Sequence, residues 1–212
     1  MELKSENQMS EKELKEFITK SRQRNKMLDE ESGLEAIKKL SDVAKDSNVN
    51  WAVVGGFAMY FYDSPRFTKD VDIIANKRLP LESIGQLVQG GEHYEVEIKK
   101  RKVPIDWIIR NDVAKRYYET ALSEAFDFNG IPVITPEWLV ILKFIAGRFK
   151  DQEDSVFLLR QDKLVNRKKI KENIIKVSGQ DSWALVKVGL FRWFDIADGK
   201  IADGDDNSYR EI

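Results

Sequence analysis

The fold is decided by two neighbouring stretches, WAVVGGFAMYFY at residues 51–62 and RFTKDVDII at residues 66–74. The apolar run at residues 51–54 predicts a buried strand. Gly55-Gly56 predicts a turn where the backbone can adopt unusual conformations and a ligand can come close. Residues 57–62 favour a short helix that stops near Pro65. The free backbone N–H groups at the start of such a helix suit phosphate.

The second stretch predicts a strand that carries two acids. Side chains alternate along a strand, so Asp70 and Asp72 should point to one face while Val71 and Ile73 point into a core. Two adjacent carboxylates repel each other unless a cation joins them, and hard oxygen ligands favour magnesium.

Each signal alone has an ordinary explanation. A Gly-Gly pair is usually only a turn, and Asp-x-Asp is usually a solvated strand face. Together they put a phosphate cradle beside a metal-binding pair, which is the geometry that phosphoryl or nucleotidyl transfer needs.

The joint pattern resembles a known signature. Gly55-Gly56, thirteen intervening residues and Asp70-Val71-Asp72 are similar to the signature of the DNA polymerase beta nucleotidyltransferase superfamily. The finer pattern, Gly-Gly-x-Ala and then Arg66-x-Thr68-x-Asp70-x-Asp72, resembles its abortive-infection (AbiEii-like) toxin branch. The superfamily resemblance covers about residues 50–110, and the branch resemblance extends weakly to about residue 160.

The resemblance implies a third carboxylate on a neighbouring strand. Asp106, the sole acid in the apolar run of residues 103–109, is the best match, and its implied role is to activate the attacking hydroxyl or to bind the metal. The alternative is a structural aspartate in an ion pair, since a buried lone charge is costly.

A second block at residues 136–154 resembles the same branch. The resemblance implies that Lys143 contacts nucleotide phosphate, although a lysine in so apolar a helix could also extend its charged end to the surface. Asp151 and Asp154 are expected either to line the cleft or to tie the helical half together. The full expected nucleotide-binding set is Gly55, Gly56, Arg66, Thr68, Lys143 and Arg148, and the expected catalytic and metal-binding set is Asp70, Asp72 and Asp106.

Composition narrows the function classes. The 212 residues carry a formal charge of −1, with 42% hydrophobic and 33% charged residues, so no global field favours nucleic acid or an acidic membrane. The absence of cysteine excludes disulfides and thiolate metal sites. No stretch is apolar enough to span a bilayer, so a cytoplasmic protein is expected. The single histidine, His93, is expected to be exposed in a turn.

The predicted fold is α/β (α+β): a small mixed sheet of the nucleotidyltransferase type, with flanking helices and a helical C-terminal part. We expect a charged arm at residues 1–31, a core at 32–134, helices at 135–194 and an acidic tail at 195–212. Residues 80–89 are expected to form a helix. Residues 126–134 are expected to form a hairpin that turns at Asn129-Gly130. The basic run of residues 99–102 is expected to be either a solvated turn or an RNA contact.

The expected function is magnesium-dependent transfer of a nucleoside monophosphate from an NTP. The resemblance implies a toxin of a toxin–antitoxin pair, with tRNA as acceptor and a cognate antitoxin as partner. Two alternatives stay open: an antibiotic-modifying nucleotidyltransferase, and a catalytically silent module that retains the nucleotide pocket.

Overall fold

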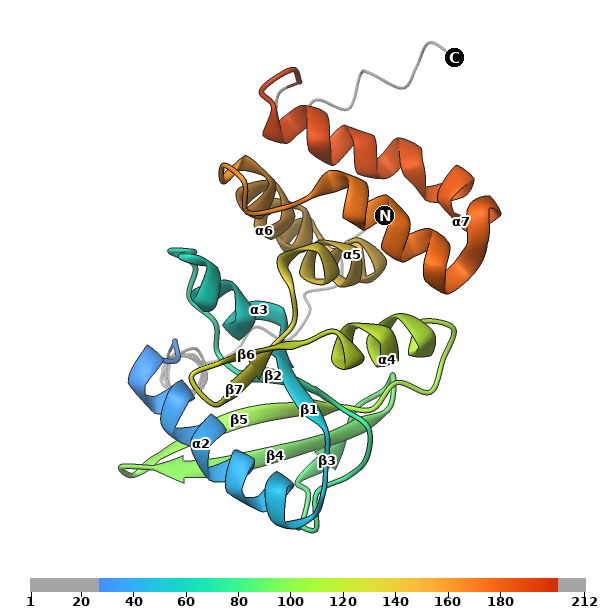
Figure 1. Cartoon of the computed structure of the whole chain (residues 1–212). Helices are drawn as coiled ribbons and strands as arrows, with labels where there is room; N and C mark the ends of the chain where they lie inside the picture. Colours follow the sequence, from blue (N-terminus) through green and yellow to red (C-terminus); the bar gives the residue numbers. More distant parts are fainter. Residues whose placement is uncertain (1–26, 202–212) are drawn as a thin grey trace, which may run out of the picture.

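A seven-stranded mixed sheet forms the base of the molecule, and a group of helices stands on one side of it (Figure 1). The computed structural model describes residues 27–201. The strand order is β3-β4-β5-β2-β1-β7-β6. The β1–β7 and β2–β5 pairs are parallel, and the other neighbouring strands are antiparallel. The predicted fold class, α/β with a mixed sheet, flanking helices and a helical C-terminal part, is therefore confirmed.

The strands are β1 (Trp51–Val54), β2 (Val71–Ala75), β3 (Gly85–Gln86), β4 (Gly91–Ile98), β5 (Arg101–Ile108), β6 (Phe126–Phe128) and β7 (Ile131–Val133). The helices are α2 (Glu30–Asp46), α3 (Gly55–Ala58), the 3-10 turn η1 (Met59–Tyr62), α4 (Lys115–Ser123), α5 (Pro136–Ala146), α6 (Phe149–Arg160) and α7 (Arg167–Ala197).

Helix α2 begins where a side chain caps it. The Asp29 carboxylate accepts the backbone N–H of Ser32 at 2.8 Å, which satisfies one of the free donors of the first turn. Its apolar stripe includes Ile37, Leu40 and Ala44, all buried. Figure 1 shows α2 along one side of the sheet, while α4 and the stacked α5–α7 lie on the other.

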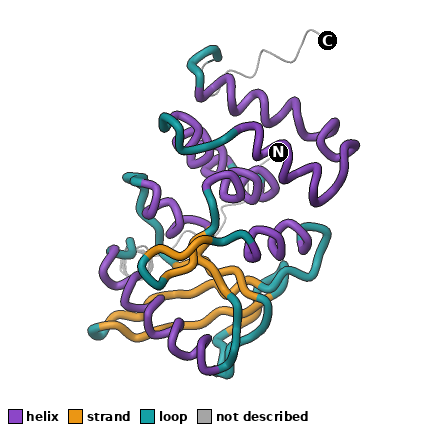
Figure 2. The backbone as a smooth tube through the Cα atoms, in the orientation of Figure 1, coloured by secondary structure: helices purple, strands orange, loops and turns teal. Residues whose placement is uncertain are grey.

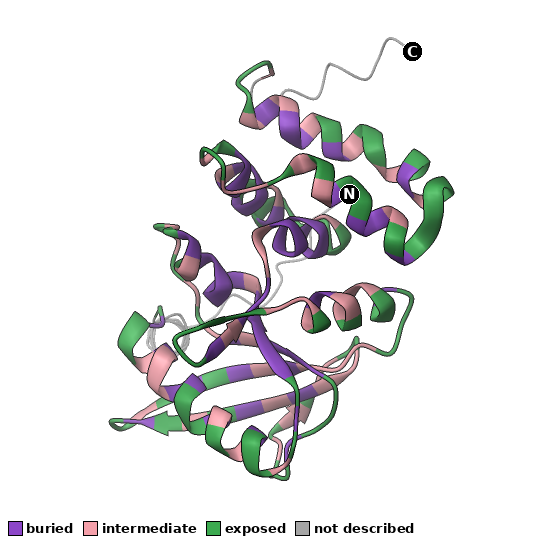
Figure 3. Ribbon diagram, in the orientation of Figure 1, coloured by how far each residue is buried: buried purple, intermediate pink, exposed green. Residues whose placement is uncertain are grey.

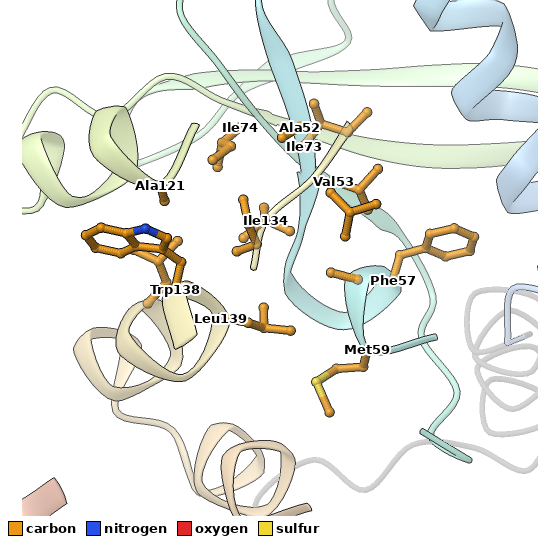
Figure 4. Packing of buried hydrophobic residues seen from close by; sticks show 14 of the residues in the cluster. Ala52, Val53, Phe57, Met59, Ile73, Ile74, Ala121, Ile134, Trp138 and Leu139 are labelled. Carbon is orange, nitrogen blue, oxygen red and sulfur yellow. The ribbon is translucent and has the colours of Figure 1, made fainter. Parts of the chain in front are cut away.

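The core continues from the sheet into the helical part. Figure 3 shows burial concentrated in the central strands and in α5. In Figure 4, Trp138 and Leu139 of α5 lie beside Ala121 and Ile134, and all four side chains are fully buried. Trp138 also donates its indole N–H to Glu124 at 2.7 Å, as a buried tryptophan requires a partner.

Two glycines shape the helical part, whose path is clear in Figure 2. Gly147 ends α5 with a φ of +66°, the left-handed conformation that glycine adopts easily. Gly179, with a φ of +86°, breaks α7 into two arms. Among residues 27–201, no helix combines the length and apolar character needed to cross a membrane.

Several local predictions can be compared with the structure. The hairpin at Asn129-Gly130 is confirmed, since both residues have positive φ, as a type I′ turn requires. The helix predicted at residues 80–89 is wrong. Ile84 and Leu87 instead donate backbone hydrogen bonds to His93 and Gly91 of β4, so this segment adds a short edge strand to the sheet.

The basic run at residues 99–102 forms the β4–β5 turn. Lys99 pairs with Glu31 and Glu35, and Arg101 pairs with Asp29, so these cations fasten α2 to the hairpin. Most of the arm predicted at residues 1–31 and the end of the tail predicted at 195–212 lie outside the described residues. The division into a core at 32–134 and helices at 135–194 stays a prediction.

Candidate active site

One row of paired residues crosses four strands of the sheet. Val54 of β1 pairs with Asp72 of β2, Asp72 with Asp106 of β5, and Asp106 with His93 of β4. Residues that pair directly across a sheet point to the same face. Asp72 and Asp106, two of the three predicted carboxylates, therefore lie side by side on one face of the sheet.

The Gly-Gly turn is built around Asp72. The Gly56 N–H donates to Asp72 Oδ2 at 3.0 Å. Gly55 has a φ of +66°, and a Cβ added there would lie 2.0 Å from the same Asp72 oxygen. A Cβ on Gly56 would lie 2.7 Å from Thr68 Oγ1. The two glycines are thus needed to let a carboxylate and a hydroxyl reach the turn.

Asp70 lies just before β2 and is held by its own loop. Thr68 Oγ1 donates to Asp70 Oδ1 at 2.9 Å. The predicted set of site residues treats Thr68 as a nucleotide contact, and the structure gives it a hydrogen bond that orients the Asp70 carboxylate.

The three carboxylates influence one another electrostatically. Burial, together with the negative charges of Asp70 and Asp106, raises the pKa of Asp72 to about 6, although the Gly56 hydrogen bond opposes the shift. Burial also raises the pKa of Asp106, while its hydrogen bond with His93 lowers it. Without a cation, the site is therefore unfavourable for three ionised groups.

His93 was expected in an exposed turn, and the turn is wrong although the side chain is partly exposed. It lies in β4, its side chain is 41% exposed, and its Nδ1 is 2.7 Å from Asp106 Oδ1. The histidine therefore fixes one oxygen of the third carboxylate, and it is a site residue that the sequence reasoning missed.

A network of charges joins the two halves of the cleft on the side of the Gly-Gly turn. Lys143 of α5 is only 5% exposed, and its Nζ lies 2.5 Å from Asp154 Oδ2 and 3.6 Å from Asp151 Oδ1. Arg66, from the loop before β2, contacts the same Asp154 carboxylate. The alternative that Lys143 extends to the surface is wrong, because its ammonium group stays buried among acids.

Arg148 completes this network at the N-terminus of α6. Its Nε lies 2.6 Å from Asp151 Oδ2. Burial alone would raise the pKa of Asp151, but the Arg148 guanidinium and the Lys143 ammonium hold that pKa below its usual value. Asp151 and Asp154 therefore tie the helices to each other and to Arg66.

Two adjoining cavities border the carboxylate row. The larger, about 310 Å³, contains Asp72 and Asp106 on its sheet side and Tyr118, Ile145 and Arg148 on its helix side. The smaller, about 70 Å³, connects Gly55, Asp72, Lys143 and Tyr118. The space between sheet and helices is therefore lined by predicted site residues, together with Tyr118 of α4, which was not predicted.

The fit of magnesium can be judged from the oxygen atoms. Asp70, Asp72 and Asp106 each have one carboxylate oxygen held by a neighbour, and within residues 27–201 no hydrogen bond engages the other oxygen. No group of three acidic or histidine side chains in this range is arranged to hold a metal ion. Magnesium commonly binds through one or two carboxylates plus substrate phosphates, so the Asp70–Asp72 pair fits an ion that arrives with a nucleotide.

Among the comparisons with known proteins, one solved structure supports the fold. No family model and no curated protein sequence matches the chain. One similar solved structure is an antigenic nucleotidyltransferase-like protein from Paracoccidioides brasiliensis, with 17% identity over 80% of this chain and 94% of that one, at a TM-score of 0.50. At that identity the likeness shows the fold, which is nucleotidyltransferase-like.

Two further structures are more distant. JHP933 from Helicobacter pylori is 15% identical over 82% of this chain and 83% of that one, with a TM-score of 0.44. The Megavirus polyadenylate synthase is 15% identical over 85% of this chain and 46% of that one, with a TM-score of 0.39. The resemblance to the abortive-infection branch stays a prediction from the motifs.

Proposed function

We propose that this chain is a magnesium-dependent nucleotidyltransferase that moves a nucleoside monophosphate from an NTP to an acceptor hydroxyl. The observation that carries the proposal is the cross-strand pair of Asp72 and Asp106, which faces a cavity beside Gly55-Gly56. The nucleotidyltransferase-like fold supports the same class of reaction.

In this proposal Asp70 and Asp72 hold the metal. A magnesium ion there would neutralise charge on the phosphates and on the departing pyrophosphate. The chain's own acids outnumber its cations in the cleft, so a polyphosphate needs such a counter-charge to remain bound.

Asp106 acts on the acceptor. The acceptor oxygen attacks the α-phosphorus, the new P–O bond forms as the bond to the β-phosphate oxygen breaks, and pyrophosphate leaves. The hydroxyl proton passes to the Asp106 oxygen that His93 does not hold. The raised pKa of Asp106 suits this role, because it makes the carboxylate a better proton acceptor.

Arg66, Lys143 and Arg148 are the proposed phosphate contacts. Asp154 and Asp151 partner all three. Phosphate oxygens would compete with these carboxylates, so nucleotide binding should loosen the ion pairs between Arg66 and α6. The role of toxin, with tRNA as acceptor and an antitoxin as partner, rests on the motif resemblance.

The test has two parts. Calorimetric titration of ATP, GTP, CTP and UTP should show binding with magnesium and its loss in excess EDTA. Equal affinity in both conditions would contradict metal-dependent binding. The second part follows α-phosphate label from each NTP onto total RNA, aminoglycosides and lincosamides, with Asp70→Asn as the inactive control.

The acceptor panel separates the candidate functions. Labelled RNA supports the RNA-modifying reaction, and a labelled drug supports the antibiotic-modifying class. Nucleotide binding without transfer to any acceptor would favour a catalytically silent module. That alternative is kept because no three acidic or histidine side chains within residues 27–201 are arranged to hold a metal ion.

A further inference from the structure

Tyr118 and Arg110 form a wall of the cleft that takes no part in the proposed metal binding or phosphate binding. Tyr118 of α4 borders both cavities that contain Asp72. The Arg110 guanidinium lies over its ring, 4.9 Å from the ring centroid. Arg110 also borders the larger cavity, where Ile108 and Ile145 add apolar surface.

The Arg110 guanidinium is held in place and largely neutralised. Its Nε donates to Asp112 Oδ1 at 3.0 Å, and its Nη2 donates to the other oxygen of the same carboxylate. Asp112 also accepts the backbone N–H of Ala114 just before α4, at 3.1 Å. An arginine paired in this way offers a flat surface more than a free charge, so this wall is poorly suited to phosphate.

Tyr118 differs from three other tyrosines of the protein. Tyr62, Tyr94 and Tyr117 each have a hydroxyl that hydrogen-bonds to a neighbour. Within residues 27–201 the Tyr118 hydroxyl has no such partner, although the side chain is partly buried. A tyrosine whose apolar ring lines a cavity and whose hydroxyl is not taken up by the protein is typical of a contact surface for a ligand.

We propose that Tyr118, backed by Arg110, is the surface on which the nucleobase of the donor NTP stacks. The inference rests on the proposed function and adds to it where the base lies. The smaller cavity joins Tyr118 to Gly55 and Lys143, so phosphates held at those residues bring the attached nucleoside to the tyrosine. Stacking on a ring is tolerant of base identity, so the site should accept several NTPs with modest preference.

The experiment separates the contribution of the base to binding affinity from the contribution of the phosphates. Calorimetry with magnesium compares each NTP with inorganic tripolyphosphate, which has the phosphates and no base. The variants are Tyr118→Leu, which keeps much of the volume without an aromatic face, and Tyr118→Phe, which keeps the ring. Tyr117→Leu is the matched control, because its hydroxyl bonds to Ser178 on α7 and it borders neither cavity containing Asp72.

We expect Tyr118→Leu to weaken NTP binding by between about five- and 150-fold, the range for loss of one stacked base. Tripolyphosphate affinity should change less than about twofold, and Tyr118→Phe and Tyr117→Leu should bind NTP much as the wild type does. Thermal unfolding of each variant checks that it is folded.

Three results would overturn the inference. Tyr118→Leu could bind NTP normally, it could lose NTP and tripolyphosphate equally, or the wild type could bind both ligands with the same affinity. If the wild type binds neither ligand with magnesium, the proposed function itself fails and the stacking site falls with it.

Discussion

Replacing Asp72 by asparagine should make the metal-free protein more stable at neutral pH. Asparagine keeps an oxygen that can accept the Gly56 N–H, and it removes one of three mutually repelling charges. The rise in the Asp72 pKa from 3.8 to about 6 corresponds to about 3 kcal/mol against the ionised form, at about 1.36 kcal/mol per pKa unit. Since the side chain keeps some contact with solvent, we expect a gain of about 1–3 kcal/mol.

The sign of the pH dependence follows from the direction of the shift. The folded protein binds the Asp72 proton more tightly than the unfolded chain, so ionisation costs stability above about pH 6. That cost shrinks as the pH falls towards 3.8. Asp72→Asn should therefore exceed the wild type in stability at pH 8, and the difference should fade by about pH 4.

Urea unfolding followed by tryptophan fluorescence measures this difference, with EDTA present, at pH values from 4 to 8. The exposed Asp42→Asn substitution on α2 serves as the control and should run parallel to the wild type. A stability difference that stays constant with pH, or an Asp72→Asn protein less stable at pH 8, would refute the electrostatic reasoning. Adding magnesium and NTP should then stabilise the wild type and leave Asp72→Asn unchanged.

Three further substitutions test other parts of the site. Lys143→Met should lower NTP affinity roughly ten- to a hundredfold. It should also cost about 1.5–3 kcal/mol of stability, because Asp154 and Asp151 lose the buried ammonium and keep only Arg66 and Arg148 as partners. Adding Asp154→Asn should restore part of the stability in the same urea assay but not the affinity. Gly55→Ala should lower the free energy of unfolding by at least about 1–2 kcal/mol, because residue 55 has a left-handed backbone. It should also abolish NTP binding in calorimetry. A variant with normal melting and binding would show that the turn tolerates a side chain. His93→Ala should lower kcat roughly ten- to a hundredfold with little change in KM for NTP. His93→Asn should recover part of the lost kcat, because its amide can donate to Asp106. Equal kcat in the wild type and both variants would mean that the histidine has no role in catalysis.

The buried charges show how far the sequence could predict the site. Strand alternation is a local pattern and was enough to place Asp72 on a polar face of its strand, whereas Asp106 was picked out by the family resemblance, because its pairing with Asp72 joins strands that lie far apart in the sequence. The environment of Lys143 was left open, since its partner Asp154 lies on the next helix and only the packing of α5 against α6 brings the two together. The structure makes this lysine more important for stability than a surface phosphate contact would be.

His93 could have been found from the register of one hairpin. The loop between β4 and β5 has two residues, Lys99 and Lys100, both with positive φ. Once that turn is recognised, counting back along each strand pairs His93 with Asp106. A turn was predicted across residues 99–102, but the two residues at its tip were not identified, because such turns usually contain Asn-Gly and two lysines give no such signal.

Tyr118 was missed for a similar reason. Tyr117 and Tyr118 are adjacent on α4, and neighbouring residues of a helix point about 100° apart. Which of two adjacent tyrosines faces the cleft depends on the rotation of the helix about its own axis. That rotation is set by packing on the sheet and α5, which the sequence of α4 alone does not encode.

The parallel pairing of β1 with β7 has a consequence for synthesis of the chain. Val53 aligns with Val133, and Ile134 donates its backbone N–H to Val53, so one edge of β1 finds its partner only when a segment 80 positions later has been made. Until then the nascent chain presents Trp51–Val54, a wholly apolar strand, with that edge unpaired. The sheet that carries the carboxylates is therefore completed late, and the emerging polypeptide passes through a stage in which association with other chains competes with its own folding.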